Sequence, residues 1–165
     1  RGGAGGAFRR IKGIFSGGAA AAEVALPVDF LDPGSRAVPP DARECLDAVA
    51  EAGAGRPLKF SIETGFIGSP SAIARMVGLL SGCGAGCVKT ASGLYPKMSS
   101  ISDLNAALSA LDAMGEGGAG LDFLFDPKLA NRFVIDDAFR LAGKVCGAEF
   151  AWDGRFSVSV PFEIL

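Results

Sequence analysis

Lys89 is the residue whose surroundings point most directly to chemistry. It lies in the segment Cys87–Gly93, which reads Cys-Val-Lys-Thr-Ala-Ser-Gly. One β/α unit earlier, the segment Leu58–Gly65 reads Leu-Lys-Phe-Ser-Ile-Glu-Thr-Gly. Both segments run from apolar residues into hydroxyl or charged residues and then glycine, which is typical of a buried parallel strand whose carboxyl end opens into a site. Lysine is rarely buried without a partner, and a desolvated amine is the kind of nucleophile that forms a Schiff base.

Apolar segments spaced by about 30 residues predict five parallel strands joined by helices. The expected strands are Glu23–Val28, Leu58–Ile62, Gly86–Ala91, Leu121–Phe125 and Glu149–Trp152. Apolar residues at helical spacing predict helices at Ala7–Phe15, Asp41–Ala52, Pro70–Gly82, Ser100–Gly115 and Val134–Val145. The pattern therefore predicts an α/β fold.

The two ends of the chain differ from this pattern. Residues 1–22 are rich in Gly, Ala and basic residues, and the segment Phe156–Phe162 alternates Phe or Val with Ser, which indicates an edge strand or an extended arm. We therefore divide the chain into a basic N-terminal segment with its helix (1–22), a β/α domain (23–152) and a C-terminal extended arm (153–165).

Length and charge exclude several classes of protein. The chain has 165 residues, enough for one domain but fewer than the roughly 250 of a complete (β/α)8 barrel. A net charge of −2 and a pI near 5.1 argue against nucleic acid as the main partner. No apolar run approaches the ~20 residues of a membrane-spanning helix.

The basic start of the chain has two interpretations. Arg1, Arg9, Arg10 and Lys12 occur without an acidic residue among the first 22, which resembles the end of an organelle transit segment and favours a mitochondrial location. In the second interpretation, the positive charges lie on the surface of an ordinary helix, and the protein is cytoplasmic. Because the chain begins with arginine, we expect it to be processed or incomplete at its start.

The cysteines do not predict a metal site. Cys45, Cys83, Cys87 and Cys146 occur in a chain without histidine, and no second pair completes four ligands around Cys83 and Cys87. Buried, reduced cysteines and no cofactor are expected. The absence of histidine also excludes catalysis of the Ser-His-Asp and Cys-His types.

The segment from Leu58 to Leu94 resembles the deoxyribose-phosphate aldolases, class I aldolases on a (β/α)8 TIM barrel. Strands 5 and 6 of that family read close to Leu-Lys-Val-Ile-Ile-Glu-Thr-Gly and Phe-Val-Lys-Thr-Ser-Thr-Gly-Phe. The resemblance implies a partial TIM barrel of about five β/α units, from the third helix to the eighth strand, that lacks strands 1 to 3. It also implies that Lys89 forms the imine, that Gly93 lies at a phosphate-binding position, and that Ser92 and Thr90 are further candidate substrate-binding residues.

Other residues depart from the family pattern. The aspartate of strand 4, which assists proton transfer, is replaced by Ala25, and the strand 7 lysine and glycines are replaced by the sequence of Leu121–Pro127. The phosphate-binding Gly-Thr-Ser-Ser of strand 8 is matched to Phe150–Gly154. Asp29 and Lys128 are the candidates for displaced substitutes.

These departures favour a structural lysine over a catalytic one. In the structural interpretation, Lys89 pairs with Glu63 on the neighbouring strand, and Lys59 and Thr64 are ordinary strand-end residues. Trp152, Phe156 and Phe162 are then candidate anchors to a partner, or are buried under the end of the barrel.

We therefore expect a non-catalytic, aldolase-like structural or accessory subunit of a larger assembly, whose partners are other protein subunits. The alternative is a lyase that cleaves a phosphorylated sugar through an imine on Lys89, with Lys128 and Asp29 as helpers. A ligand sensor that binds sugar without turnover is a third class.

Overall fold

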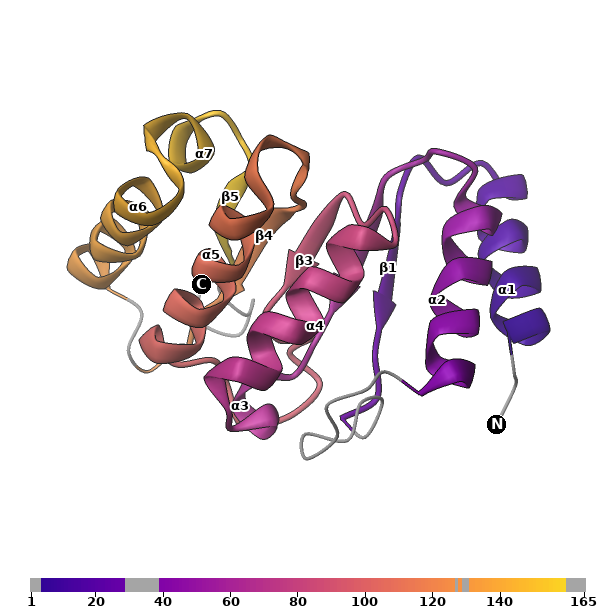
Figure 1. The fold of residues 1–165 in the computed structure, drawn as a ribbon, viewed down its shortest axis with the longest axis horizontal. Coiled ribbons are helices and arrows are strands. Elements are labelled where there is room, and N and C mark those ends of the chain that lie inside the picture. The colour runs from indigo at the N-terminus through magenta and orange to yellow at the C-terminus, as the bar shows by residue number, and fades with distance from the viewer. Residues whose placement is uncertain (1–3, 29–38, 127, 129–130, 160–165) are drawn as a thin grey trace.

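Five parallel strands form a single sheet in which the spatial order follows the sequence, β1-β2-β3-β4-β5 (Figure 1). The structure is a computed structural model and describes residues 4–28, 39–126, 128 and 131–159. The strands are β1 (Ala22–Ala25), β2 (Leu58–Ser61), β3 (Cys87–Lys89), β4 (Gly120–Leu124) and β5 (Phe156–Ser159). The predicted α/β class and its parallel strands are confirmed.

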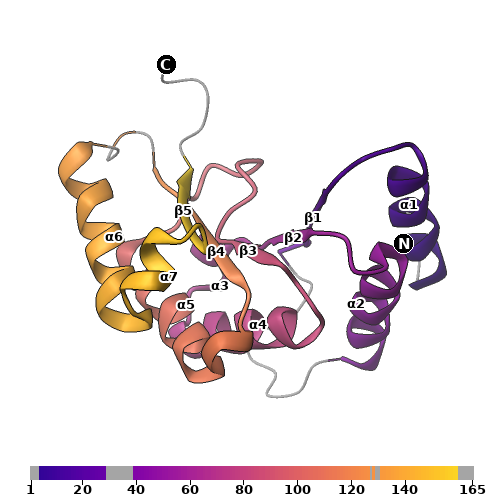
Figure 2. The ribbon, with the colours of Figure 1, turned by 90° about the horizontal axis from the view of Figure 1, so that it is seen from above.

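Helices connect successive strands and gather along one side of the sheet (Figure 2). They are α1 (Ala4–Ser16), α2 (Pro40–Gly53), α3 (Thr64–Ile67), α4 (Pro70–Gly82), α5 (Ile101–Met114), α6 (Arg132–Cys146) and α7 (Ala148–Trp152), and a 3-10 turn spans Gly115–Gly117. Each of the five predicted helices is present. None of the helices among the described residues is long and apolar enough to cross a membrane.

The main core lies between the sheet and these helices. Phe60, Val88, Leu121 and Phe123 on the strands are fully buried, and helix α4 contributes an equally buried stripe of Ile73, Val77 and Leu80. The stripe recurs at i, i+4 and i+7, as expected of a helix with one apolar face. Burying side chains of this size contributes roughly 1.5–3 kcal/mol each, so this interface is the main source of stability.

The strand predicted at Glu149–Trp152 is wrong, because these residues belong to helix α7. Gly147 has φ +92° and separates α7 from α6, a backbone conformation that favours glycine. The short helix buries Phe150 and Ala151 and leaves Trp152 exposed. A segment of four or five residues is too short for its periodicity to distinguish one helical turn from a strand.

The fifth strand is instead Phe156–Ser159, within the segment predicted to be an edge strand or an arm. It pairs in parallel with β4 at the edge of the sheet, so the edge-strand alternative is correct for these four residues. Phe156, one candidate anchor, is buried, whereas Trp152 is exposed and stacks on Phe139. Phe162 lies outside the described residues.

The N-terminus of α5 allows a matched test of helix capping. The Ser100 side chain accepts a hydrogen bond from the Asp103 N–H (3.2 Å), and Asp103 Oδ2 accepts one from the Ser100 N–H (2.8 Å). Ser69 occupies the equivalent position before α4 but makes no side-chain cap. We expect Ser100→Ala to lower the free energy of unfolding by about 1 kcal/mol, and Ser69→Ala to change it by less than about 0.5 kcal/mol. Urea unfolding of both variants measures the difference, and equal effects would contradict this account.

Candidate functional site

The face of the sheet opposite the core helices carries a row of polar side chains, which we call the polar face. Side chains alternate between the two faces of a strand, and the register places Ser61, Lys89, Asp122 and Ser157 side by side on β2 to β5, with Ala25 beside them on β1. A second row, Glu23, Lys59 and Cys87, lies one pleat nearer the amino ends of the strands. The sheet therefore separates an apolar face from a charged one.

Lys89 points along the polar face and forms an ion pair with Glu23. Its Nζ lies 3.5 Å from Glu23 Oε1, so the contact crosses the intervening strand β2. The same carboxylate oxygen accepts a hydrogen bond from Ser61 Oγ on β2. The Lys89 side chain is only 15% exposed, whereas that of Glu23 is 42% exposed at the edge of the sheet.

The predicted pairing of Lys89 with Glu63 is wrong. Glu63 follows the end of β2 and precedes α3, where its Oε1 accepts hydrogen bonds from the backbone N–H (3.0 Å) and the hydroxyl of Ser92. Its buried Oε2 has no hydrogen-bond partner among the described residues. Glu63 therefore holds the loop after β3, and Lys89 pairs with Glu23 on the far side of β2 instead.

A second ion pair lies next to the first. Lys59 Nζ on β2 is 2.8 Å from Asp122 Oδ2 on β4, and Asp122 Oδ1 accepts a hydrogen bond from Ser159 Oγ on β5 (2.6 Å). Burial lowers the pKa of Lys59, but the hydrogen bond and charge of Asp122 outweigh this effect and leave the pKa above its usual value. Lys59 is therefore a firmly protonated cation on the polar face.

The sequence analysis assigned no role to Asp122, which forms the second ion pair of the polar face. It is 2% exposed and lies between two fully buried residues of β4, Leu121 and Phe123. A charged residue within an apolar strand was the signal that drew attention to Lys89, and the same signal was available for Asp122.

Cys87 shares the polar face but is not a nucleophile at neutral pH. Burial raises the pKa of its thiol to about 11, because the charges of Asp122 and Glu23 add to burial and the opposing effect of Lys59 is smaller. The thiolate is the reactive form of cysteine, so the thiol remains protonated and unreactive.

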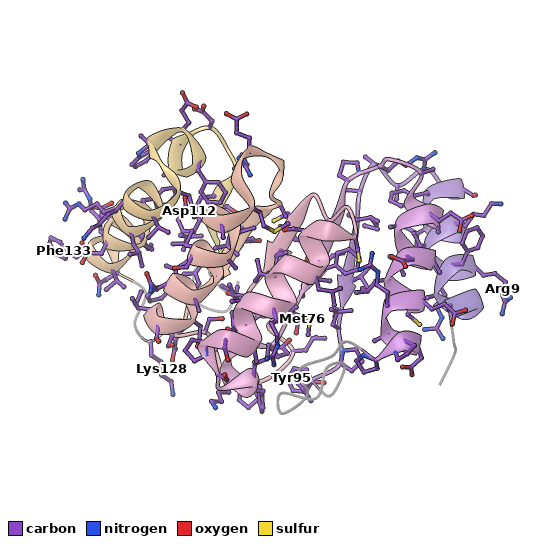
Figure 3. All side chains as sticks on the ribbon, in the orientation of Figure 1. Arg9, Met76, Tyr95, Asp112, Lys128 and Phe133 are labelled. Carbon is purple, nitrogen blue, oxygen red and sulfur yellow. The ribbon has the colours of Figure 1, made fainter. Side chains whose placement is uncertain are left out.

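Of the two residues considered as helpers of Lys89, Lys128 and Asp29, only Lys128 lies among the described residues. Ala25 occupies the Lys89 row on β1 and has no titratable group. Lys128 lies in the loop after β4, where its N–H donates to Asp126 Oδ1 (2.9 Å), and its side chain extends away from the molecule (Figure 3). Asp29 lies outside the described residues.

The candidate substrate-binding residues all have structural roles in this conformation. Thr90 is fully buried, and its Oγ1 accepts a hydrogen bond from the Leu124 N–H (3.1 Å). The Ser92 hydroxyl donates to Glu63 and accepts from the Leu94 N–H (3.0 Å). Gly93 has φ +84°, a turn conformation suited to glycine. The loop after β3 is thus held in place by hydrogen bonds to Glu63, after β2, and to Leu124 of β4.

A metal centre is not formed by the described part of the chain, in which His, Cys, Asp and Glu side chains do not gather in groups of three or more. The chemistry that the polar face can offer is therefore that of two ammonium groups and two carboxylates, with serine hydroxyls beside them.

The chain matches no known protein family model and no curated protein sequence. In fold, it is similar to two crystal structures of a putative deoxyribose-phosphate aldolase from Toxoplasma gondii ME49, with TM-scores of 0.80 and 0.82 and sequence identities of 15% and 16%. Each match covers 99% of this chain and 63% of the aldolase chain. The predicted resemblance is confirmed at the level of fold: the chain folds as a partial aldolase-type TIM barrel that spans 63% of the length of these proteins.

Proposed function

We propose that the chain acts as a non-catalytic, aldolase-like structural or accessory subunit of a larger protein assembly. The observation that carries this proposal is that both lysines of the polar face are ion-paired with carboxylates, Lys89 with Glu23 and Lys59 with Asp122. The charges are therefore balanced within the sheet.

This arrangement opposes imine chemistry. An amine attacks a carbonyl through its lone pair, which the ammonium form lacks, and nucleophilic lysines are prepared by desolvation or by a neighbouring cation. The strand residue beside Lys89 in the register is Asp122, an acid. Strand β4 brings no basic residue to the polar face.

An open sheet can be completed by further residues of the same protein, by the C-terminal arm or by another chain, and we infer that partner subunits complete it. The outer edges of β1 and β5 pair with no other strand among the described residues, and exposed edges in natural proteins are usually covered or protected. Exposed Phe133, Leu94 and Trp152 provide further apolar surface for partner subunits. The basic, acid-free residues 1–22 favour a mitochondrial location for such an assembly.

The second candidate function is a lyase of the deoxyribose-phosphate aldolase type, acting on a phosphorylated sugar. Lys89 favours it, because its side chain remains 15% exposed on the polar face and has the Glu23 carboxylate at 3.5 Å as a proton acceptor. In this role Lys89 forms the imine, and Thr90, Ser92 and Gly93 shape the substrate-binding end.

Imine trapping distinguishes the two functions. We expect incubation with deoxyribose 5-phosphate and borohydride to leave Lys89 unmodified, because its Nζ is engaged in the ion pair with Glu23. Intact mass and peptide mapping measure the adduct, with an authentic class I aldolase as the positive control and Lys89→Met as the blank. A stoichiometric adduct that disappears in Lys89→Met would support the lyase and overturn the structural role.

The second ion pair tests the structural role directly. Asp122→Asn removes the counter-charge of the 36% exposed Lys59 side chain and the charge-assisted hydrogen bonds of the 3% exposed Asp122 side chain, and we expect it to lower the free energy of unfolding by roughly 1–3 kcal/mol. The matched control is Asp47→Asn, which removes the exposed Arg43–Asp47 pair and is expected to cost less than about 0.5 kcal/mol. Urea unfolding compares the two, and an Asp122→Asn cost as small as that of the control would contradict a structural role for the pair.

A further inference from the structure

The loop between β3 and α5 is fixed at both ends and exposed in its middle. At its start, Thr90 is fully buried and its Oγ1 is bonded to the Leu124 N–H. At its end, Ser99 is buried and its Oγ accepts a hydrogen bond from Thr64 Oγ1 (2.8 Å). Between these ends, residues 93–97 are all exposed and belong to no helix or strand. A segment with few buried contacts between rigid ends is of the kind that opens locally while the core stays folded.

The middle of this loop is held by contacts with the end of β2 and with helix α3. Ser92 donates both its N–H (3.0 Å) and its hydroxyl to Glu63 Oε1. Tyr95 packs edge-to-face on Phe66 of α3, with ring centroids 5.6 Å apart, and the Lys97 ammonium lies 5.7 Å from the same ring. Both rings of this group remain exposed. The hydrogen bonds from Ser92 to Glu63 are therefore the principal contact that holds the loop closed.

The carboxylate that receives these bonds is satisfied on one side only. Glu63 is 3% exposed, and its Oε1 accepts both hydrogen bonds from Ser92. Its Oε2 is buried and has no hydrogen-bond partner among the described residues. A buried polar atom without a partner carries a desolvation cost that contact with water removes. The bonds to Ser92 therefore favour the closed loop, whereas the unpaired Oε2 favours opening, and the two effects partly cancel.

We propose that residues 92–97 form a lid over Glu63, which is held closed by Ser92 and opens while both ends of the loop stay in place. Opening replaces the Ser92 donors by water, hydrates Oε2 and exposes the Glu63 carboxylate at the carboxyl ends of the strands. Gly93, which follows Ser92 with φ +84°, is suited to a hinge because glycine adopts both signs of φ readily. The inference goes beyond the subunit role and does not depend on it, since it concerns local opening within the chain.

Carboxyl labelling with a carbodiimide and glycine ethyl ester measures the exposure of Glu63. In the unaltered chain, we expect Glu63 to react at least about tenfold more slowly than Glu23, whose side chain is 42% exposed. Ser92→Ala removes the hydroxyl donor, and we expect it to speed the labelling of Glu63 at least about tenfold. Ser157→Ala is the matched control, because it removes a hydroxyl of the polar face that does not bond to Glu63. Equal labelling of Glu63 in the two variants would overturn the proposal.

Hydrogen exchange distinguishes opening of a lid from loosening of the whole end of the sheet. In Ser92→Ala, we expect the protection factor of the residue 92 amide, which bonds to Glu63, to fall at least about tenfold. The Leu124 amide, which bonds to Thr90 at the fixed start of the loop, is expected to keep its protection. A parallel loss of protection at Leu124 would show that the strand end loosens as a unit, and would refute a lid with fixed ends.

Glu63→Gln provides a second variant should Ser92→Ala fail to fold. The amide side chain keeps an oxygen that accepts from Ser92 but loses the negative charge, and hydrogen bonds to a charged acceptor are roughly twice as strong as neutral ones. We therefore expect the Ser92 amide to lose protection in Glu63→Gln as well, again with the Leu124 amide unchanged. Full protection of the Ser92 amide in this variant would contradict the role of the Glu63 carboxylate in holding the lid closed.

Discussion

The structure depends on neutralising charged side chains on one face of a parallel sheet. Parallel sheets are usually covered on both faces, and lysine or aspartate is rarely buried unless paired. Here two ion pairs meet this requirement, one from β1 to β3 and the other from β2 to β4. Because each pair spans an intervening strand, the two pairs interleave and join four successive strands on the face opposite the helices. Ser61 donates a hydrogen bond to the Glu23 carboxylate. Ser159 donates one to the Asp122 carboxylate and so extends the network to β5.

The same pairing limits the chemistry that the face can perform. A buried ion pair gives little net stability compared with apolar packing, but removing one partner leaves an uncompensated charge at a high cost. A reactive lysine requires the opposite arrangement, in which the amine lacks a counter-charge and has a cation nearby. Lys59 is the nearest candidate for that cation, yet Asp122 holds its ammonium at 2.8 Å. A polar face organised for charge balance is therefore poorly organised for Schiff-base formation.

Sequence reasoning recovered the elements whose periodicity extends over several turns or strands. Helix α4 and the strands around Phe60 and Val88 were predicted because their apolar patterns are long and bounded by glycine or proline. Glu149–Trp152 was assigned to a strand because a single helical turn has no distinctive period, and this error placed the fifth strand too early. The partner of Lys89 was also missed, because adjacency of strands in the sheet suggested Glu63, whereas Glu63 bonds to Ser92 and Glu23 lies within 3.5 Å of Lys89. Contacts of this kind depend on register and rotamer, which the sequence pattern does not specify.

The arrangement of helices and strands also explains why the core is complete although the described sheet is open. In a complete barrel each strand has two neighbours, and closure removes every edge. The described sheet has five strands in sequential order, and a further strand beside β1 is not present among the described residues. The core beneath β2 to β4 is fully formed without that strand, since Phe60, Val88 and Leu121 are already completely buried. The core beneath β2 to β4 therefore does not depend on a further strand beside β1. The apolar face of the sheet and the helices that cover it thus form a complete core, while the charges on the polar face are held in ion pairs.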